Sequence, residues 1–301
     1  MPERRPGARD LFLPVALLVV GMVSIQTGAA FAKQMFPVVG TTGAAALRLL
    51  FAALILCAAL RPWRLRLTAA AWRSILIYGV AVAGLNNLFY ASLRTVPLGI
   101  ATALEFAGPL LLAMLSSRRA ADFLWIGLAI GGLLLLLPLG LTSTGVDSLG
   151  ALLALGAGAC WALYIVFGQK AGAEHGIQMT AVGVAIAAAC ALPFGVARAG
   201  AALFTPSILP YAVAAAVLST ALPHSLEMVA LGRLPTKTFG TLMSLEPAVG
   251  ALSGLVLLNE RLTVTQWVAV GAIIGASVGA TTTAARKEEV PHLSAPPTVG
   301  A

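Results

Sequence analysis

Three charged residues lie inside stretches of sequence that are otherwise apolar, and they are the first candidates for chemistry. Glu105 is the only charged residue of ATALEFAGPLLLAML (101–115), Glu246 lies in SLEPAVG, and Arg48 lies in GAAALRLLFAALIL. An ionised side chain in an apolar setting costs several kcal/mol unless it is paired, hydrated or neutral. Because such residues usually mark a substrate or ion pathway, we expect these three near a polar site inside the protein.

Prolines free backbone carbonyls close to these residues. Pro109 has no N–H, so the helical hydrogen bond to the carbonyl of Glu105, four residues back, cannot form. Pro223 frees the carbonyl of Ser219 in the same way. Loosened backbone at membrane depth is tolerated where protein or water lines a cavity. The alternative is that the prolines only kink helices and the glutamates stay protonated against their neighbours.

Polar and aromatic residues at helical spacing predict a site for a small zwitterion. Asn86 and Tyr90 are four apart in YGVAVAGLNNLFY, and Trp161 and Tyr164 are three apart in ACWALY, so each pair shares a helix face. A zwitterion needs donors for its carboxylate, acceptors for its ammonium and aromatic walls. The residues that we predict to bind substrate are Arg48, Asn86, Tyr90, Glu105, Trp161, Tyr164 and Glu246. In the alternative interpretation, Arg48 is a structural counter-ion and the aromatic residues serve packing or the membrane interface.

Four titratable residues are candidates for carrying a proton, namely Glu105, Glu246, Glu227 and His224. A histidine titrates near neutrality, which suits His224 for a relay with Glu227 three residues later. The alternative is that these two only pack against each other. Two ligands without further partners do not make a metal site, so we expect no metal and no cofactor.

Apolar runs must position all of these residues. The chain of 301 residues is 59% hydrophobic and only 10% charged, and its mean hydropathy is +0.94. A soluble domain has about a quarter charged residues, and about 20 helical residues cross a bilayer core of about 30 Å. The sequence therefore predicts an all-α polytopic membrane protein with ten transmembrane helices. Their predicted ranges are 11–32, 42–60, 74–93, 98–117, 123–139, 148–168, 178–197, 207–230, 239–258 and 265–283.

The two halves of the chain repeat the same markers at nearly one offset. Glu105 and Glu246 are 141 residues apart, and Trp125 and Trp267 are 142 apart. Each half holds five spans, and an odd number gives the second half the opposite orientation, so we expect two inverted five-helix repeats, a device of transporters. The predicted divisions are 1–10, a cytoplasmic N-terminus; 11–139 and 148–283, the two repeats; and 284–301, a disordered cytoplasmic tail.

Basic residues are distributed unevenly between the predicted loops. Fourteen fall on the side that carries both termini, and four fall on the other, namely Lys33, Arg94, Arg198 and Arg261. The positive-inside rule then places both termini in the cytoplasm.

Small-residue patterns point to packing and not to catalysis. Glycines four apart in GLAIG (127–131) and GAIIGASVG (271–279) predict close helix contacts in the fifth and tenth spans. GASVG also matches the G-x-S-x-G motif of hydrolases, but that motif needs a strand, a turn and a helix, whereas this one lies within a continuous span. We find no nucleophile with a base and no metal cluster, so we expect no enzyme.

Three long segments carry a resemblance to a known family. TVPLGIATALEFAGPLLLAMLSSRR, ALGAGACWALYIVFGQKAGAEHG and LSTALPHSLEMVALGRLPTKTFGTLMSLEPAVGALSG resemble the bacterial threonine and homoserine exporters of the EamA group, in the drug/metabolite transporter superfamily. The resemblance implies a ten-helix carrier of the bacterial inner membrane that exports threonine, homoserine and related amino acids by proton antiport with alternating access. Its implied partners are small amino acids, protons and the lipid bilayer, with no nucleic acid. The alternative is an exporter of the same fold for another small metabolite or drug.

Overall fold

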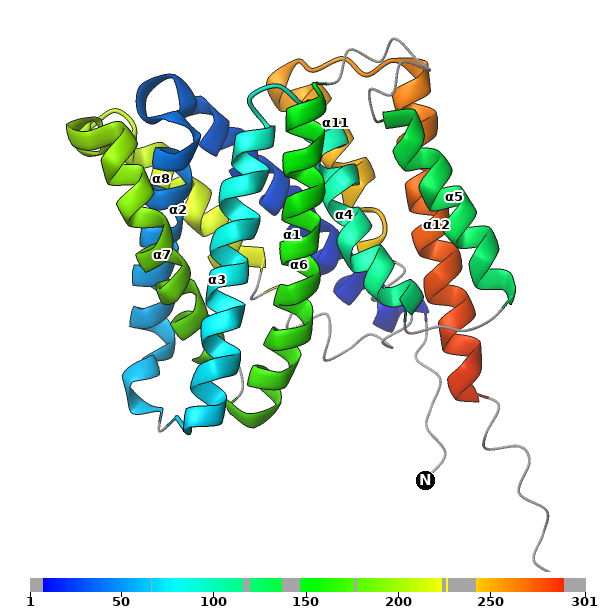
Figure 1. Ribbon diagram of the computed structural model, residues 1–301, viewed down its shortest axis with the longest axis horizontal. Coiled ribbons are helices and arrows are strands. Elements are labelled where there is room, and N and C mark those ends of the chain that lie inside the picture. Colours follow the sequence, from blue (N-terminus) through cyan, green and yellow to red (C-terminus); the bar gives the residue numbers. More distant parts are fainter. Residues whose placement is uncertain are drawn as a thin grey trace, which may run out of the picture.

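The computed structural model describes residues 8–65, 67–115, 120–136, 147–175, 178–223, 226 and 242–289 (Figure 1). These ranges contain helices and no strands. The ten α-helices in them are α1 (Ala8–Gln34), α2 (Phe36–Leu60), α3 (Ala69–Ser92), α4 (Leu98–Leu115), α5 (Ala120–Leu136), α6 (Ser148–His175), α7 (Gln178–Ala199), α8 (Leu209–Ala216), α11 (Glu246–Leu258) and α12 (Val264–Glu289). Two short 3-10 turns, η1 (Pro62–Arg64) and η2 (Gly200–Phe204), and a π-helical turn, η3 (Val217–Ala221), complete the described elements.

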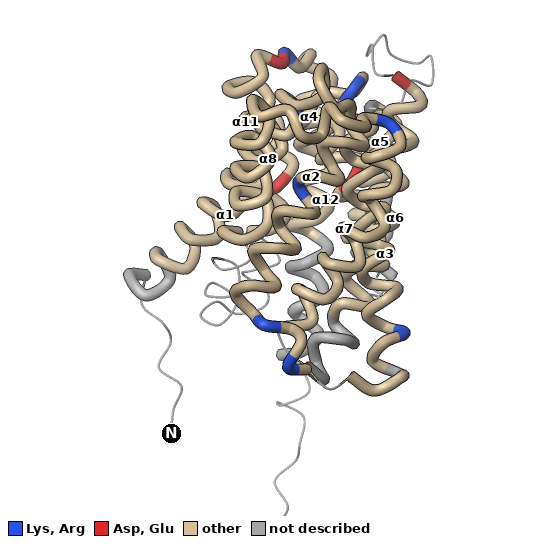
Figure 2. The backbone as a smooth tube through the Cα atoms, turned by 90° about the vertical axis from the view of Figure 1, so that its left-hand side faces the viewer, with Lys and Arg blue, Asp and Glu red and all other residues tan. Residues whose placement is uncertain are grey.

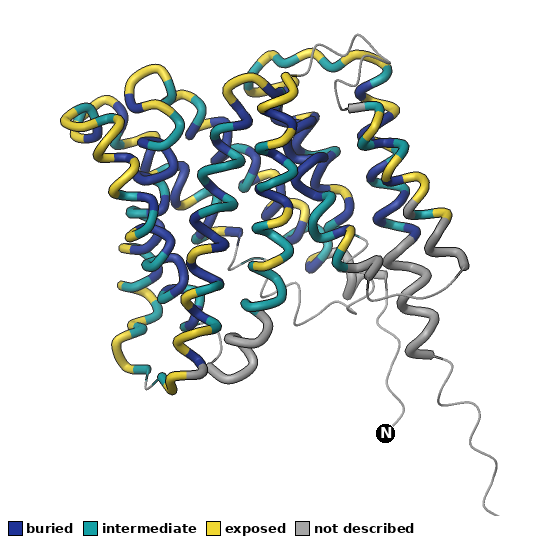
Figure 3. Tube along the Cα trace, in the orientation of Figure 1, coloured by how far each residue is buried: buried dark blue, intermediate teal, exposed yellow. Residues whose placement is uncertain are grey.

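Five of the described helices are long and apolar enough to cross a membrane. They cover Leu13–Gln34, Phe36–Leu60, Ala71–Ser92, Ser148–Gly168 and Gln178–Phe204. Large apolar side chains on the outside of the bundle are exposed, for example Leu54 at 57% and Val256 at 71%, which suits a surface in contact with lipid (Figure 3). The predicted all-α polytopic membrane fold is confirmed.

Local sequence explains where several helices begin and end. Thr68 caps α3, because its side chain accepts a hydrogen bond from the Ala71 N–H at 3.2 Å. Asp147 caps α6 by accepting from the Gly150 N–H at 2.7 Å. Asn259 ends α11 in the left-handed region, with φ 55°. Within α2, Gly40 has φ 68° and breaks the helical path, a conformation that glycine adopts without strain.

The helices pack so that most neighbours are distant in sequence. α2 packs along α7, α3 packs along α6 and α7, and α4 lies between α6 and α11. α5 and α12 form a pair on the right of Figure 1, and this pair contacts the rest of the bundle mainly through α4. A buried cluster of apolar residues joins α1, α2, α4, α6 and α12, and a second joins α2, α3 and α7. Figure 2 shows charged residues at both ends of the bundle, with a few acidic and basic positions at mid-height.

The glycines of the α5 and α12 pair bear out the predicted close contacts only in part. Among the described residues, a Cβ added at Gly127, Gly131 or Gly271 would meet nothing within 4 Å, so the predicted close approach at these positions is wrong. Close contacts do occur at Gly279, which belongs to the predicted pattern, and at Gly132, which does not. Gly279 faces the Trp125 ring, at 2.2 Å from an added Cβ, and Gly132 faces the Ala269 carbonyl, at 3.0 Å. Spacing alone shows that glycines share a face, and it does not show which face a neighbouring helix covers.

Three segments are less regular, or more extended, than the predicted spans. In the predicted 207–230 helix, the α-helix from Leu209 to Ala216 is interrupted by the π-helical turn η3 and resumes at Leu222 and Pro223. The predicted 239–258 helix is interrupted by a turn at 244–245, so that α11 begins at Glu246 with Pro247 in its first turn, where a missing N–H costs nothing. At the other extreme, α12 continues to Glu289, six residues beyond the predicted end, through residues that favour helix.

Candidate functional site

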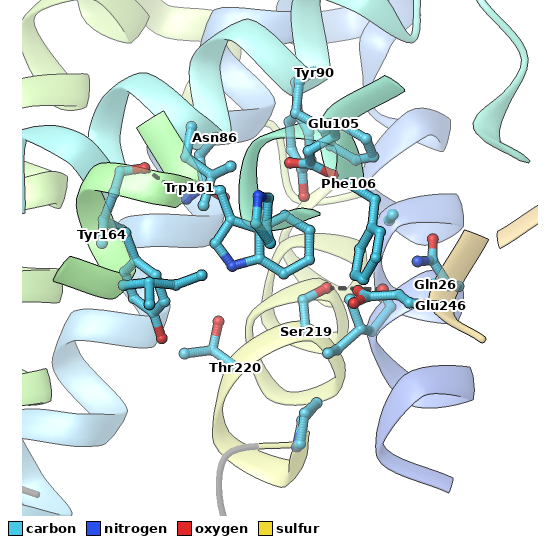
Figure 4. Close-up of a pocket in the computed structure, with 18 of the residues that line it drawn as sticks. Gln26, Asn86, Tyr90, Glu105, Phe106, Trp161, Tyr164, Ser219, Thr220 and Glu246 are labelled. Atoms are coloured by element: carbon cyan, nitrogen blue, oxygen red, sulfur yellow. Dashed lines mark hydrogen bonds between the residues drawn. The ribbon is translucent and has the colours of Figure 1, made fainter. Parts of the chain in front are cut away.

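A cavity of about 480 Å³ lies in the middle of the bundle and brings the predicted substrate-binding residues together. All seven of them line it: Arg48, Asn86, Tyr90, Glu105, Trp161, Tyr164 and Glu246. They come from α2, α3, α4, α6 and α11, and Figure 4 shows six of them around one space. Residues of α1, α7, η3 and α12 complete the wall. The volume falls within the range of small-molecule sites, which is about 300 to 1,000 Å³.

Arg48 of α2 is held by several groups at once. One Nη atom donates to Asn86 Oδ1, and the other lies 3.3 Å from the Ser219 carbonyl and 3.5 Å from Thr220 Oγ1. The guanidinium also lies over the ring of Tyr90, 5.7 Å from its centroid, a cation–π arrangement. These contacts fix the guanidinium at the cavity wall, where a planar fork suits a carboxylate.

The Ser219 carbonyl is the group that Pro223 was predicted to free. It lies in the π-helical turn η3, where the regular ladder of hydrogen bonds is interrupted, and it accepts from Arg48. The turn is held on its other side by α1, because Ser24 Oγ donates to the Leu218 carbonyl at 2.7 Å. Gly28 makes this approach possible, since a Cβ there would lie 2.1 Å from Ser219 Oγ. Sequence and structure therefore agree that this proline exposes a carbonyl for use inside the bundle.

Glu105 of α4 is 8% exposed and lies at a close crossing of α4 and α6. Its carbonyl, which Pro109 leaves without a helical donor, faces Gly158, at 2.4 Å from a Cβ added there. A larger residue on α6 would push the two backbones apart. The small residue thus lets α6 cover the freed carbonyl while the carboxyl faces the cavity.

Glu246 is 5% exposed and lies in the first turn of α11. The free N–H groups and the dipole of a helix N-terminus favour a carboxylate there by about 0.3–1 kcal/mol. Glu105 lines the same cavity as Glu246 and Arg48. Two carboxyl groups and one guanidinium therefore share one cavity of low polarity.

Arg48 and Glu105 do not form an ion pair. Within the described ranges, the ion pair closer than 4.0 Å is the one between Lys33 and Glu260, at 2.6 Å. Arg48 is instead satisfied by the Asn86 amide and by the carbonyl and hydroxyl of η3. The guanidinium thus lines the cavity together with the two glutamates and forms no ion pair with Glu105.

Aromatic side chains form the remaining walls. Tyr78 stacks on Tyr164 with ring centroids 5.1 Å apart, and Trp161 meets Phe106 edge to face at 5.8 Å. The Tyr78 ring packs directly against Gly183 of α7, because a Cβ added at Gly183 would lie 2.0 Å from the ring. The face of α3 that was predicted to carry Asn86 and Tyr90 is turned toward the cavity, and Tyr78 also lines it.

Several cavity residues were not predicted from sequence. Gln26 of α1, Ser277 of α12 and Thr220 of η3 all line the cavity. Gln26 was detectable as an amide inside an apolar run, GMVSIQTGAA, but a single amide has no partner in sequence to strengthen the signal. Two predicted residues, His224 and Glu227, lie outside the described residues.

Comparison with known proteins identifies close relatives. Residues 148–282 match the model of the EamA-like transporter family. The chain is 54% identical to the threonine/homoserine exporter RhtA of Escherichia coli (strain K12), over 94% of this chain and 96% of that one. It is 56% identical to the protein of the same name from Salmonella typhimurium (strain LT2), with the same coverage. A crystal structure of another protein, only 19% identical, superposes with a TM-score of 0.61 over 91% of this chain and 99% of that one.

The similarity to the two exporters extends over 94% of the chain, so it includes the helices that line the cavity. The relatives are named as exporters and not as enzymes, in agreement with the prediction from the missing catalytic groups. Identity above half over this length is far beyond what a shared fold alone requires. The chain is a member of the EamA-like transporter family.

Proposed function

We propose that this protein exports threonine, homoserine and related small amino acids across the bacterial inner membrane. The observation that carries the proposal is the single cavity that holds Arg48 together with Glu105 and Glu246. A free amino acid differs from most other small metabolites in presenting one carboxylate and one ammonium close together. The names of the relatives, at 54 and 56% identity, point to the same substrates.

In this proposal the charged ends of the substrate bind to opposite charges. The carboxylate binds the Arg48 guanidinium, which Asn86 and the Ser219 carbonyl hold in place. The ammonium lies between the carboxyl groups of Glu105 and Glu246. Tyr90, Trp161 and Tyr164 form the walls against the short side chain. The cavity volume of about 480 Å³ leaves room for a small amino acid with some water.

The same carboxyl groups suit proton coupling. A buried carboxyl is favoured as the charged form when a cation lies beside it and as the neutral form when it is left alone in an apolar site. We infer that Glu105 holds the substrate ammonium in one state and a proton in the other, so that cargo and proton exclude each other. Glu246 is the second candidate, and His224 and Glu227 remain candidates from sequence alone.

Alternating access between two inverted repeats is supported by how the helices pair. If each half contributes five spans, α2 corresponds to α7, α4 to α11 and α5 to α12, and each of these three pairs is in contact. In the same scheme α1 corresponds to α6 and α3 corresponds to α8. The contact of α3 with α6 therefore has its counterpart in the contact of α8 with α1, which also occurs. A two-fold relation in the membrane plane would give this pattern, with the cavity near the axis.

The orientation of the protein follows from loop charge. The fourteen basic residues on the side of the termini favour a cytoplasmic location for both ends, and Lys33 and Glu260 then lie at the periplasmic end. A reporter fused to the C-terminus is expected to be active only in a cytoplasmic assay.

The export function is tested in cells. Overproduction of the protein should make a bacterium resistant to inhibitory threonine or homoserine and should lower the internal concentration of both. The Arg48→Leu variant, inserted at the same level, is the matched control and should give no resistance. Unchanged internal threonine and homoserine with confirmed insertion of the wild type would contradict the proposal, and efflux of unrelated drugs instead would favour another cargo.

A further inference from the structure

Some buried polar atoms at the cavity have no hydrogen-bond partner within the described part of the chain. Among them are Arg48 Nε, Tyr90 Oη and Gln26 Oε1. A buried polar atom left unpaired costs about 1–3 kcal/mol, and such an atom at a cavity indicates a group that a ligand satisfies. Arg48 and Tyr90 belong to the proposed carboxylate site. Gln26 has no role there.

Gln26 lies on α1, which forms the opposite side of η3 from Arg48. The side chain is 2% exposed and lines the cavity, and Figure 4 shows it on the same side as Glu246. Ser219 fixes this geometry, because its Oγ donates to the Ile25 carbonyl at 3.4 Å while its own carbonyl accepts from Arg48 at 3.3 Å. One residue of η3 therefore separates the backbone next to Gln26 from the guanidinium.

The chemistry of an amide identifies the group that it would bind. A side-chain amide is neutral and offers both a donor and an acceptor, as does a hydroxyl, whereas a carboxylate only accepts and an ammonium only donates. The charged ends of an amino acid already have partners of opposite charge in this cavity. The group that remains on threonine and homoserine is the hydroxyl, carried on Cβ in one and on Cγ in the other.

We infer that Gln26 binds the side-chain hydroxyl of the substrate and determines the preference of the carrier for hydroxylated amino acids. The inference rests on the proposed export function and specifies which part of the substrate sets the selectivity. The long side chain of Gln26 has three rotatable torsions, so it reaches a hydroxyl on either carbon. An analogue without the hydroxyl leaves the buried amide unpaired and binds more weakly for that reason.

One compound tests both substrates, because removal of the hydroxyl from threonine or from homoserine gives 2-aminobutyrate. The full chain in proteoliposomes is assayed for exchange of labelled threonine, homoserine and 2-aminobutyrate. The wild type should prefer threonine over 2-aminobutyrate by about tenfold or more, the ratio expected for one unpaired buried group. Gln26→Met keeps the length and removes the amide, so this ratio should fall at least fivefold while exchange of 2-aminobutyrate is maintained.

A matched control is Gln266→Met, which removes another buried amide. Gln266 is 4% exposed on α12, accepts from the Thr263 N–H at 2.8 Å and does not line the cavity. Its substitution should leave the substrate ratio at the wild-type value. A wild-type ratio in Gln26→Met, with normal insertion and activity, would overturn the inference.

A second variant covers the case in which Gln26→Met does not insert. Gln26→Asn keeps the amide but retracts it by one methylene, which favours the substrate whose hydroxyl lies farther from the charged ends. The ratio of homoserine to threonine exchange should therefore rise, and an unchanged ratio would overturn the inference. Absence of any exchange by the wild type would overturn the proposed function itself, and it is distinguished because it does not depend on either variant.

Discussion

Two groups of buried or half-buried polar residues in the described part of the bundle differ in how fully their hydrogen bonds are satisfied. At one end, the Glu260 network consists of Lys33, Leu98 and Glu260. Both carboxylate oxygens of Glu260 are used, one by Lys33 Nζ and one by the Leu98 N–H, each at 2.6 Å. In the central cavity, Gln26, Arg48 and Tyr90 each keep a buried polar atom without a partner among the described residues.

This difference separates a structural role from a functional one. A fully bonded network of α1, α4 and the segment after α11 stabilises one arrangement of the helices. Small residues strengthen it, since a Cβ added at Gly99 would lie 2.4 Å from the Ala251 backbone. The cavity instead keeps unmet hydrogen-bonding capacity, which a substrate can satisfy. We therefore expect substitutions in the cavity to change transport and substitutions in the Glu260 network to change stability.

The largest effect is expected from Arg48→Leu. The variant removes the proposed partner of the substrate carboxylate and leaves the Asn86 side chain without its charged donor. Loss of a charge-assisted contact of about 3 kcal/mol corresponds to a fall in transport of at least about a hundredfold. The measurement is exchange of labelled threonine in proteoliposomes, with exposed Arg94→Leu as the control. Wild-type exchange by Arg48→Leu would show that Arg48 is only a structural counter-ion.

Glu105→Gln should separate substrate exchange from proton coupling. The amide keeps the shape of the side chain but cannot take up a proton, so uptake driven by a pH gradient should fall to background. Exchange of labelled for unlabelled substrate, which needs no net proton movement, should continue. Glu260→Gln makes the same chemical change in the Glu260 network and should keep both activities. Gradient-driven transport by Glu105→Gln at the wild-type rate would assign Glu105 a packing role.

An intermediate effect is expected at the α4 and α6 crossing. Gly158→Ala places a Cβ 2.4 Å from the Glu105 carbonyl, where the neighbour is backbone and cannot turn away. Overpacking of this kind costs about 1–3 kcal/mol in the free energy of unfolding. Gly131→Ala, whose added Cβ meets nothing within 4 Å among the described residues, should leave this free energy unchanged or raise it by less than about 1 kcal/mol. Unfolding of the two purified variants in detergent compares them, and equal stability would contradict the observed closeness of the crossing.

The smallest effect concerns the ion pair in the Glu260 network. The side chains of Lys33 and Glu260 are 27% and 13% exposed, so water screens part of their attraction. A double-mutant cycle with Lys33→Met and Glu260→Gln should give a coupling of about 0.5–1.5 kcal/mol in the free energy of unfolding. A coupling near zero would remove the argument that this network stabilises the end of the bundle.

Much of the site was predictable because the signals are local. An acid or a base within an apolar run stands out whatever its surroundings, and helical spacing shows which residues share a face, as with Asn86 and Tyr90. The missing N–H of a proline affects the carbonyl four residues earlier, so the free carbonyl of Ser219 is predictable from the position of Pro223 alone. The helix breaks before Glu246 and at η3 were less predictable, since apolar composition does not distinguish a continuous span from an interrupted one.

The sequence by itself determined the class of protein, the approximate helices and seven of the residues that line the cavity, because hydropathy, spacing and buried charge are properties of short segments. Only the tertiary structure decided how those residues are connected. Arg48 is hydrogen-bonded to Asn86 and Ser219, which are 38 and 171 positions away, and forms no ion pair with Glu105. Gln26 lines the cavity because α1 packs against η3, and this packing is not visible in the sequence. Both outcomes depend on which helix faces meet, and that is set by packing between segments far apart in the chain, where a single glycine such as Gly28 or Gly158 decides how closely two backbones approach.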